Sequence, residues 1–174
     1  MNRSAFIRFA ALILVFALVG AFVVATVARR NAQASVAERL YATSLADAEG
    51  HLQALSQWRG QYLVVNFWAT WCAPCVAEMP ELDRLQRQFA ARNVAIVGIG
   101  IEGEQQVREF RDRLGLRLTL LAGGYRALSL ARDFGDDQGV LPYTVLLSTK
   151  GEVLHSRAGA LQPGQMQAWL AALQ

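Results

Sequence analysis

Residues 64–82, VVNFWATWCAPCVAEMPEL, decide how this 174-residue chain folds. They hold its only two cysteines, Cys72 and Cys75, where a strongly apolar strand at residues 62–68 is expected to give way to a helix. Two thiols on one helical turn can close into a disulfide and open again with little backbone movement. The unpaired N–H groups and the dipole of a helix start favour a thiolate on the first of them. The spacing therefore predicts thiol–disulfide exchange, in which Cys72 attacks and Cys75 resolves the mixed disulfide.

Three other uses of the cysteine pair are less favoured. A structural zinc site needs four ligands, and the remaining candidates, His51 and His155, stand about a hundred residues apart. A purely structural disulfide would close too short a loop to constrain the unfolded chain much. A peroxidatic cysteine usually follows a threonine and, further upstream, a proline, whereas Ala69 and Val65 occupy those places. We therefore expect no metal and no cofactor beyond the redox-active disulfide.

The sequence around the cysteines resembles that of membrane-anchored, thioredoxin-like reductases of the TlpA/ResA/CcmG type. The likeness extends over about residues 45–174, and residues 140–144, VLPYT, resemble the loop that carries the cis-proline of thioredoxin folds. Asn66 stands where thioredoxin itself has a buried aspartate, and thioredoxin's lysine is missing near Gly98. These departures favour the anchored family over a cytosolic thioredoxin. The resemblance implies an α/β, thioredoxin-like fold, a central mixed sheet flanked by helices.

The resemblance also implies roles for residues beside the cysteines. Glu78 matches the family's acidic residue and would take up the proton that leaves Cys75 if burial raised its pKa; otherwise it is a solvated helix glutamate. Pro142, if cis, would remove a backbone N–H beside the sulfurs and let the backbone of Leu141 pair with an extended partner segment; otherwise it is an ordinary strand-entry proline. Trp71 would shield the sulfurs and offer a flat apolar surface to the partner, or be an exposed aromatic without a role.

The hydrophobic pattern predicts alternating helices and strands after the first core strand. Helices are expected at about residues 74–92, 104–114 and 125–134 and from about residue 163 onward, and strands at about residues 94–101, 117–121, 144–148 and 153–158. The strand at 117–121 and the helix at 125–134 resemble the strand–helix insertion that the TlpA/ResA type adds to the plain thioredoxin plan.

The motif G-x-G-x-x-G at residues 98–103 is not expected to bind a dinucleotide. Its first two glycines, Gly98 and Gly100, alternate with isoleucine inside a predicted strand instead of forming a loop after it. No acidic residue follows about 20 positions later to hold a ribose. We expect these glycines to leave room beside the active-site helix.

The N-terminal part of the chain predicts a membrane anchor. Residues 9–28 are twenty residues without a charge, which is the length a helix needs to cross a bilayer. The alternative is a signal peptide cleaved after Ala34, although the apolar run is longer than usual and two arginines separate it from that site. Four of the 17 basic residues flank this run, which leaves 13 against 14 acidic ones, so no nucleic-acid partner is expected.

The predicted organisation is a cytoplasmic N-terminus at residues 1–8, the anchor at 9–28, a tether at 29–44 and the thioredoxin-like domain at 45–174. The resemblance implies a single-pass protein of the inner membrane whose domain faces the periplasm or the outside. It implies a reductase of client disulfides, of the cytochrome c or copper-oxidase assembly type, recharged by a membrane thiol-transport protein. A disulfide oxidase or isomerase is the first alternative. A tethered copper-delivery or scaffold protein with structural thiols is the second.

Overall fold

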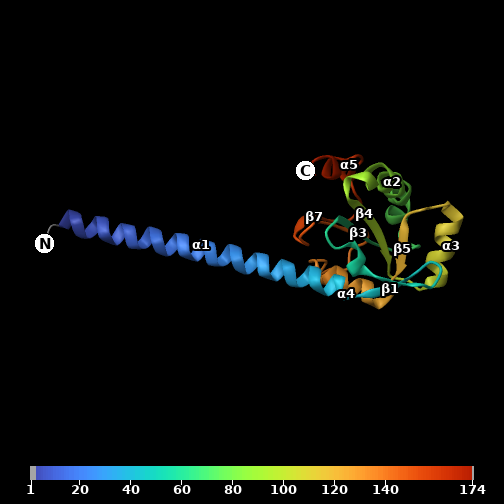
Figure 1. Cartoon of the computed structure of the whole chain (residues 1–174), viewed down its shortest axis with the longest axis horizontal. Helices are drawn as coiled ribbons and strands as arrows, with labels where there is room; N and C mark the ends of the chain where they lie inside the picture. The colour runs from blue at the N-terminus through green and yellow to red at the C-terminus, as the bar shows by residue number, and fades with distance from the viewer. Residues whose placement is uncertain (1–2, 174) are drawn as a thin grey trace.

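The computed structural model describes the backbone of residues 3–173 and the side chains of residues 12, 14, 16–28 and 36–173. A long N-terminal helix leads into a domain built of alternating strands and helices (Figure 1). The elements, in chain order, are α1 (Arg3–Tyr41), β1 (Ser44–Asp47), β2 (Leu52–Ala54), the 3₁₀ helix η1 (Leu55–Trp58), β3 (Tyr62–Trp68), α2 (Ala73–Phe89), the 3₁₀ helix η2 (Ala90–Arg92), β4 (Val94–Gly100), α3 (Glu104–Leu114), β5 (Thr119–Ala122), α4 (Tyr125–Asp133), β6 (Tyr143–Leu147), β7 (Val153–Ala158) and α5 (Gln165–Ala171).

Within the described chain, one seven-stranded mixed sheet has the order β2-β1-β5-β4-β3-β6-β7. β3, β4 and β5 run parallel at its centre, and the other pairings are antiparallel. The register places Trp68 beside Gly100 and Gly100 beside Ala122, so the carboxyl ends of the three parallel strands meet at one edge. β6 starts at the same edge, with Tyr143 opposite Phe67. The predicted α/β architecture with a central mixed sheet is confirmed.

β3 is buried on both faces and separates two layers of core. Val64 and Trp68 face the layer that α2, α3 and α5 cover, and Leu63, Val65 and Phe67 face the layer that α4 and the end of α1 cover. Successive side chains of a strand point to opposite faces, and here both faces are apolar. This is why the sequence of β3 reads as a continuous apolar run rather than an alternating one.

The end of α1 is packed into the domain. Three side chains of its last turns are buried in the layer on the α4 side: Ala37, Leu40 and Tyr41. Arg39 donates two hydrogen bonds of 3.0 Å to Asp133 on α4. Arg59, after η1, donates two of 2.6 Å to Glu38. The packed unit therefore includes the last turns of α1 in addition to residues 45–174, and the predicted tether is helical up to its attachment.

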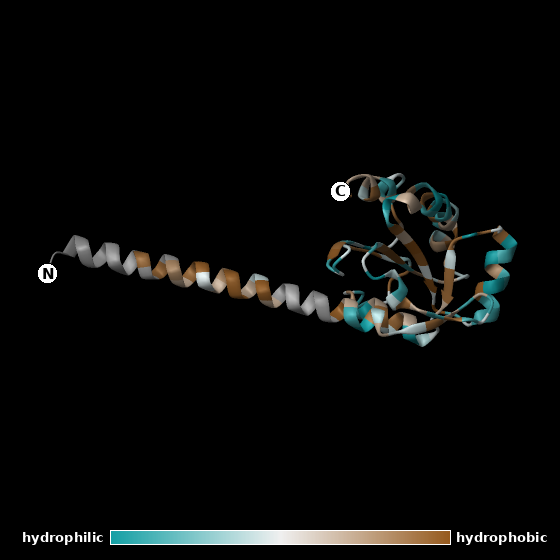
Figure 2. Ribbon diagram, viewed as in Figure 1, coloured by the Kyte–Doolittle hydropathy of each residue, from teal (hydrophilic) through white to brown (hydrophobic). Residues whose placement is uncertain are grey.

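The N-terminal part of α1 carries the predicted anchor. Residues 1–11, 13 and 15, which include the predicted cytoplasmic N-terminus, lie outside the described side chains. The described apolar side chains that follow are exposed, among them Phe16 and Phe22 at 70% and 71%. Figure 2 shows that this part of the helix is mostly hydrophobic. Over the residues that the structure describes, no helix offers a stretch both long and apolar enough to cross a membrane.

The alternating glycines of β4 leave room in the core layer that α2 and α3 cover, and side chains of neighbouring elements fill it. A Cβ atom on Gly98 would lie 2.6 Å from Leu120 Cδ2 and 3.1 Å from Trp68 Nε1. A Cβ on Gly100 would lie 3.1 Å from Val107 Cγ2. The space is taken by the large indole on the neighbouring strand and by side chains of β5 and α3. Trp68 pairs with Gly100 in the sheet register, and its indole also reaches Gly98.

Leu40 tests whether the end of α1 belongs to the domain. Its side chain is 0% exposed, whereas that of Leu52 on β2 is 76% exposed. Leu40→Ala should lower the free energy of unfolding by about 2–5 kcal/mol, because it leaves a cavity in the core. The matched change Leu52→Ala should cost less than about 0.5 kcal/mol. Urea unfolding of the full chain in detergent measures both, and a wild-type midpoint for Leu40→Ala would show that α1 is not part of the packed unit.

Candidate active site

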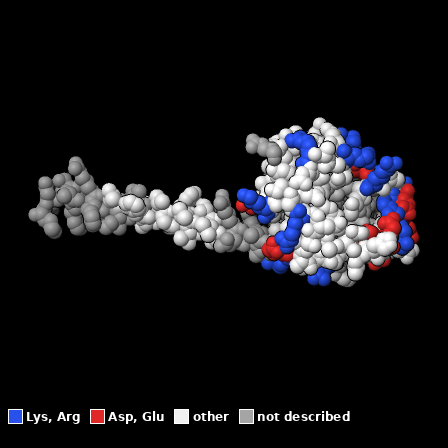
Figure 3. Space-filling model, in the orientation of Figure 1, with Lys and Arg blue, Asp and Glu red and all other residues white. Residues whose placement is uncertain are grey.

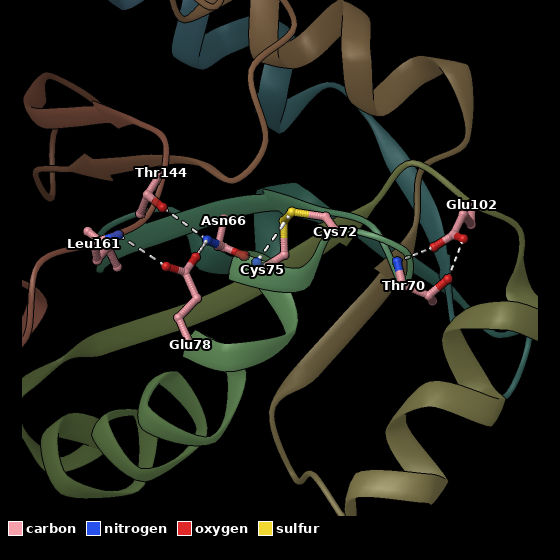
Figure 4. The surroundings of a disulfide bond; sticks show 8 residues. All are labelled: Asn66, Thr70, Cys72, Cys75, Glu78, Glu102, Thr144 and Leu161. Atoms are coloured by element: carbon pink, nitrogen blue, oxygen red, sulfur yellow. Dashed lines mark hydrogen bonds between the residues drawn. A yellow bond between two sulfur atoms is a disulfide. The ribbon is translucent and has the colours of Figure 1, made fainter.

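The two cysteines lie at the transition from β3 to α2. Cys72 is the N-cap residue of α2, and its Sγ accepts a hydrogen bond from the backbone N–H of Cys75 at 3.3 Å. Pro74 stands in the first turn, where its missing N–H costs no hydrogen bond. Cys72 and Cys75 form a disulfide, with 5.2 Å between their Cα atoms (Figure 4). Cys72 keeps 6% of its surface exposed and Cys75 none, so only the first cysteine retains any contact with solvent.

Glu78, one turn further along α2, is tied into a buried polar network. Its Oε1 accepts a hydrogen bond from Asn66 Nδ2 at 2.7 Å, and its Oε2 accepts one from the backbone N–H of Leu161 at 3.3 Å (Figure 4). The same Asn66 nitrogen donates to Thr144 Oγ1 at 2.9 Å. Asn66 on β3 and Thr144 on β6 are fully buried. Glu78 is therefore held toward the sheet and is not a freely solvated helix residue.

Burial raises the pKa of Glu78 above its ordinary value, because removal from water penalises the carboxylate. The hydrogen bonds from Leu161 and Asn66 act in the opposite direction, and the charge of Glu81 adds to the rise. The Oδ1 atom of Asn66 is buried without a hydrogen-bond partner among the described residues. A half turn of this amide would place that acceptor toward a protonated Glu78, so Asn66 can serve both forms of the carboxyl group.

The remaining predicted site residues reach the same edge of the sheet. Trp71, directly before the first cysteine, is 69% exposed. The Leu141–Pro142 peptide bond is cis and lies directly before β6, whose Tyr143 pairs with Phe67 near the end of β3. Leu141 is partly buried and packs against both core layers, one of which includes the cysteines. The fold thus brings together six residues singled out in the sequence: Trp71, Cys72, Cys75, Glu78, Leu141 and Pro142.

Sequence reasoning missed two contacts at this site. Glu102, in the loop after β4, accepts hydrogen bonds from the backbone N–H of Thr70 at 2.7 Å and from its Oγ1 at 2.6 Å (Figure 4). The other missed contact is the bond between Asn66 and Thr144. The order of the strands could have indicated the first one, since residues that follow neighbouring parallel strands meet at the same edge.

The two histidines lie away from the disulfide and from each other. His51 Nδ1 is 3.8 Å from Asp47 Oδ2, and the His155 ring stacks on Trp169 with centroids 4.7 Å apart. In the described part of the chain, no group of three or more histidine, cysteine, aspartate and glutamate side chains is placed to hold a metal ion.

Comparisons with known proteins agree with this geometry. The Redoxin family profile matches residues 31–171. The thiol-disulfide oxidoreductase ResA of Geobacillus kaustophilus is 32% identical over 118 residues, which span 67% of this chain and 66%, about two thirds, of the relative. The thioredoxin-like protein YneN of Bacillus subtilis is 30% identical over 130 residues, which span 71% of this chain and 72% of YneN.

Solved structures share the fold. A putative thiol:disulfide interchange protein DsbE from Chlorobium tepidum superposes with a TM-score of 0.65 at 23% identity, over 76% of this chain and 93% of that one. A putative thioredoxin from Neisseria meningitidis gives a TM-score of 0.62 at 26% identity, over 74% of this chain and 85% of that one. The thioredoxin-like fold is thereby confirmed.

The charge of the Glu78 carboxyl group should affect the pKa of the Cys72 thiol in the reduced protein. While ionised it disfavours a thiolate nearby through like-charge repulsion, so Glu78→Gln should lower the pKa of Cys72 in the reduced protein. The variant should fold, because the turned Asn66 amide can accept a hydrogen bond from the new side-chain amide. Thiolate absorbance against pH measures the effect, with the exposed Glu109→Gln as control. Superimposable curves for wild type and Glu78→Gln would leave Glu78 without influence on the cysteines.

The same variant should change how stability depends on pH. The folded protein holds the Glu78 proton more tightly than the unfolded chain does, so this group stabilises the fold below its unfolded pKa near 4.5. That contribution is lost as the pH rises through the raised folded pKa. Between these two pKa values the free energy of unfolding of Glu78→Gln should therefore decline less than that of the wild type. A parallel decline in both proteins would contradict the raised pKa.

Proposed function

This chain belongs to the Redoxin family and, within it, to the ResA-type thiol-disulfide oxidoreductases, and we propose that it is an extracytoplasmic reductase of disulfides in client proteins. One observation carries the proposal: the Cys72–Cys75 disulfide lies at the start of α2, where Cys72 keeps slight solvent exposure and Cys75 keeps none. The names of the relatives support the reaction class. The Ala-Pro between the cysteines supports the reducing direction, since it resembles the Gly-Pro of reducing thioredoxins.

The reaction begins with the reduced protein. The Cys72 thiolate attacks one sulfur of the client disulfide; a Cys72–client S–S bond forms and the client S–S bond breaks, which releases one client thiolate. Cys75 then loses its proton and attacks Cys72, so that the Cys72–Cys75 bond forms and the second client thiolate leaves. Two electrons pass from the dithiol to the client, and two protons complete the client thiols, one from Cys75 and one from solvent. The thiol pair carries the electrons, so the proposed reaction uses no bound cofactor or metal.

Four neighbouring residues have proposed parts in this exchange. Glu78 accepts the proton from Cys75, because its partly buried carboxyl group has a raised pKa and stands one turn away on the same helix. The client segment lies across the site, where the exposed Trp71 offers an apolar surface and the backbone of Leu141, held before the cis Pro142, offers strand-like hydrogen bonds.

We further propose that α1 anchors the protein in the inner membrane by a single span, with the domain on the periplasmic or outer side. In support, its described apolar side chains are exposed on all sides of the helix, from Phe16 to Val27, and this part carries no charge (Figure 3). A membrane thiol-transport protein recharges the dithiol in this proposal, and the clients belong to cytochrome c or copper-oxidase assembly. No nucleic-acid partner is proposed.

The assignment of the two cysteines is tested by trapping. Cys75→Ser leaves the attacking thiol but removes the resolving one, so it should accumulate a mixed disulfide with its client. Cys72→Ser should trap little, since Cys75 is fully buried. Affinity capture from cells followed by gel separation with and without reductant counts the trapped partners; we expect at least about a tenfold difference. Equal trapping by both variants would contradict these roles. Full function after both changes together would instead support the scaffold alternative.

The anchor is tested by the state of the mature protein. An uncleaved span should leave the N-terminus at or near Met1 and keep the protein with membranes in carbonate and in high salt, because about twenty buried apolar residues hold it there. Fractionation and N-terminal sequencing measure both properties. A mature chain that begins at Ser35 would show cleavage after Ala34 and refute the anchor.

A further inference from the structure

The chain passes from β3 to α2 through a tight turn at residues 69–72. The backbone N–H of Cys72 donates to the carbonyl of Ala69 at 3.2 Å and closes this turn. Thr70 and Trp71 form its middle, and the Trp71 side chain projects into solvent. The conformation of these four residues therefore places both the Cys72 sulfur and the exposed Trp71 indole. A contact that fixes the position of Thr70 therefore also fixes the Cys72 sulfur and the Trp71 indole.

Glu102 holds Thr70 from the neighbouring loop. One carboxylate accepts both the backbone N–H and the hydroxyl of Thr70, at 2.7 and 2.6 Å, from the loop between β4 and α3 (Figure 4). The backbone N–H of Ile101 donates to the carbonyl of Trp68 at 3.0 Å and fixes the two loops side by side. Hydrogen bonds to an ionised acceptor are among the stronger ones in proteins, and a bidentate pair also fixes orientation.

We propose that Glu102 is a positioning residue for thiol–disulfide exchange: its carboxylate clamps Thr70 and so keeps the Cys72 sulfur at the cap of α2 and the Trp71 indole beside it. Without the clamp, the turn samples other conformations, and the Cys72 sulfur leaves the N–H of Cys75 that favours its thiolate. This inference rests on the proposed function, because it assumes that the turn at residues 69–72 positions Cys72 for thiol–disulfide exchange. The reactivity of Cys72 can nevertheless be measured without any client.

The clamp and the charge of Glu102 have opposite effects on the Cys72 thiolate. A negative charge nearby disfavours a thiolate, whereas a fixed cap position favours it. Glu102→Gln removes the charge but keeps both contacts, because its amide oxygen can accept the Thr70 N–H while its amide nitrogen donates to the Thr70 hydroxyl. Glu102→Ala removes both charge and contacts. The two variants therefore differ in the clamp alone, and Glu78 is the same in both.

The experiment measures alkylation of Cys72 by iodoacetamide between pH 5 and 9, using the full chain in detergent and a Cys75→Ser background, in which Cys72 is the only thiol. We expect Glu102→Ala to react about three to ten times more slowly at pH 7 than Glu102→Gln, with a higher thiol pKa. Thr70→Val keeps the charge of Glu102 and the backbone contact but loses the hydroxyl contact, so it should react more slowly than the parent, with a higher thiol pKa. The exposed Glu109→Gln, on α3, should match the parent.

Equal alkylation rates and equal Cys72 pKa values for Glu102→Ala and Glu102→Gln would overturn the proposal. They would show that Glu102 affects Cys72 only through its negative charge. If Glu102→Ala fails to fold by circular dichroism, Thr70→Val decides, and a parent-like rate in that variant overturns the clamp. Failure of the proposed function shows elsewhere, as the absence of a trapped client in Cys75→Ser with wild-type Glu102.

Discussion

The position of Cys72 at the N-cap of α2 is the constraint on which the rest of the site depends. This position requires a strand, a tight turn and a helix that packs on the sheet. β3 is buried between the two core layers, and α2 packs on the sheet in one of them. Given that position, the first sulfur meets the N–H of Cys75 and keeps slight solvent exposure, whereas the second cysteine is fully buried. The asymmetry between attacking and resolving thiols thus follows from the strand-to-helix geometry itself.

Two carboxylates flank this centre and serve it differently. Glu78 comes from the same helix, lies against the buried Asn66 and has a raised pKa, so it is suited to exchange a proton. Glu102 comes from the neighbouring loop, and both of its carboxylate oxygens accept hydrogen bonds from Thr70, so it is suited to hold the turn. The end of α1 adds a third constraint. Because Leu40 is buried and α1 is continuous, the domain is attached to the proposed anchor by a helix instead of a flexible linker.

The fold could be predicted largely from local patterns, because β3 is a continuous apolar run, α3 has one apolar face and the residues around Cys72 form a specific motif. The contacts that complete the site could not. Asn66 and Thr144 are 78 residues apart, and Thr70 and Glu102 are 32 apart, so their pairing depends on strand order and register. The side chain that fills the room beside the glycines of β4, Trp68 on the neighbouring strand, also depends on the register. A short stretch of sequence does not indicate which distant residues will pack against it.

The reduction potential of the Cys72–Cys75 pair tests the central claim most directly. Equilibration of the full chain with glutathione or dithiothreitol buffers, followed by alkylation and mass measurement of the two thiols, gives this value. A reductase of client disulfides requires a potential near that of thioredoxin, about −270 mV, or lower. A potential near that of the strong periplasmic oxidant, about −120 mV, would contradict the account, because the pair would then draw electrons from client thiols.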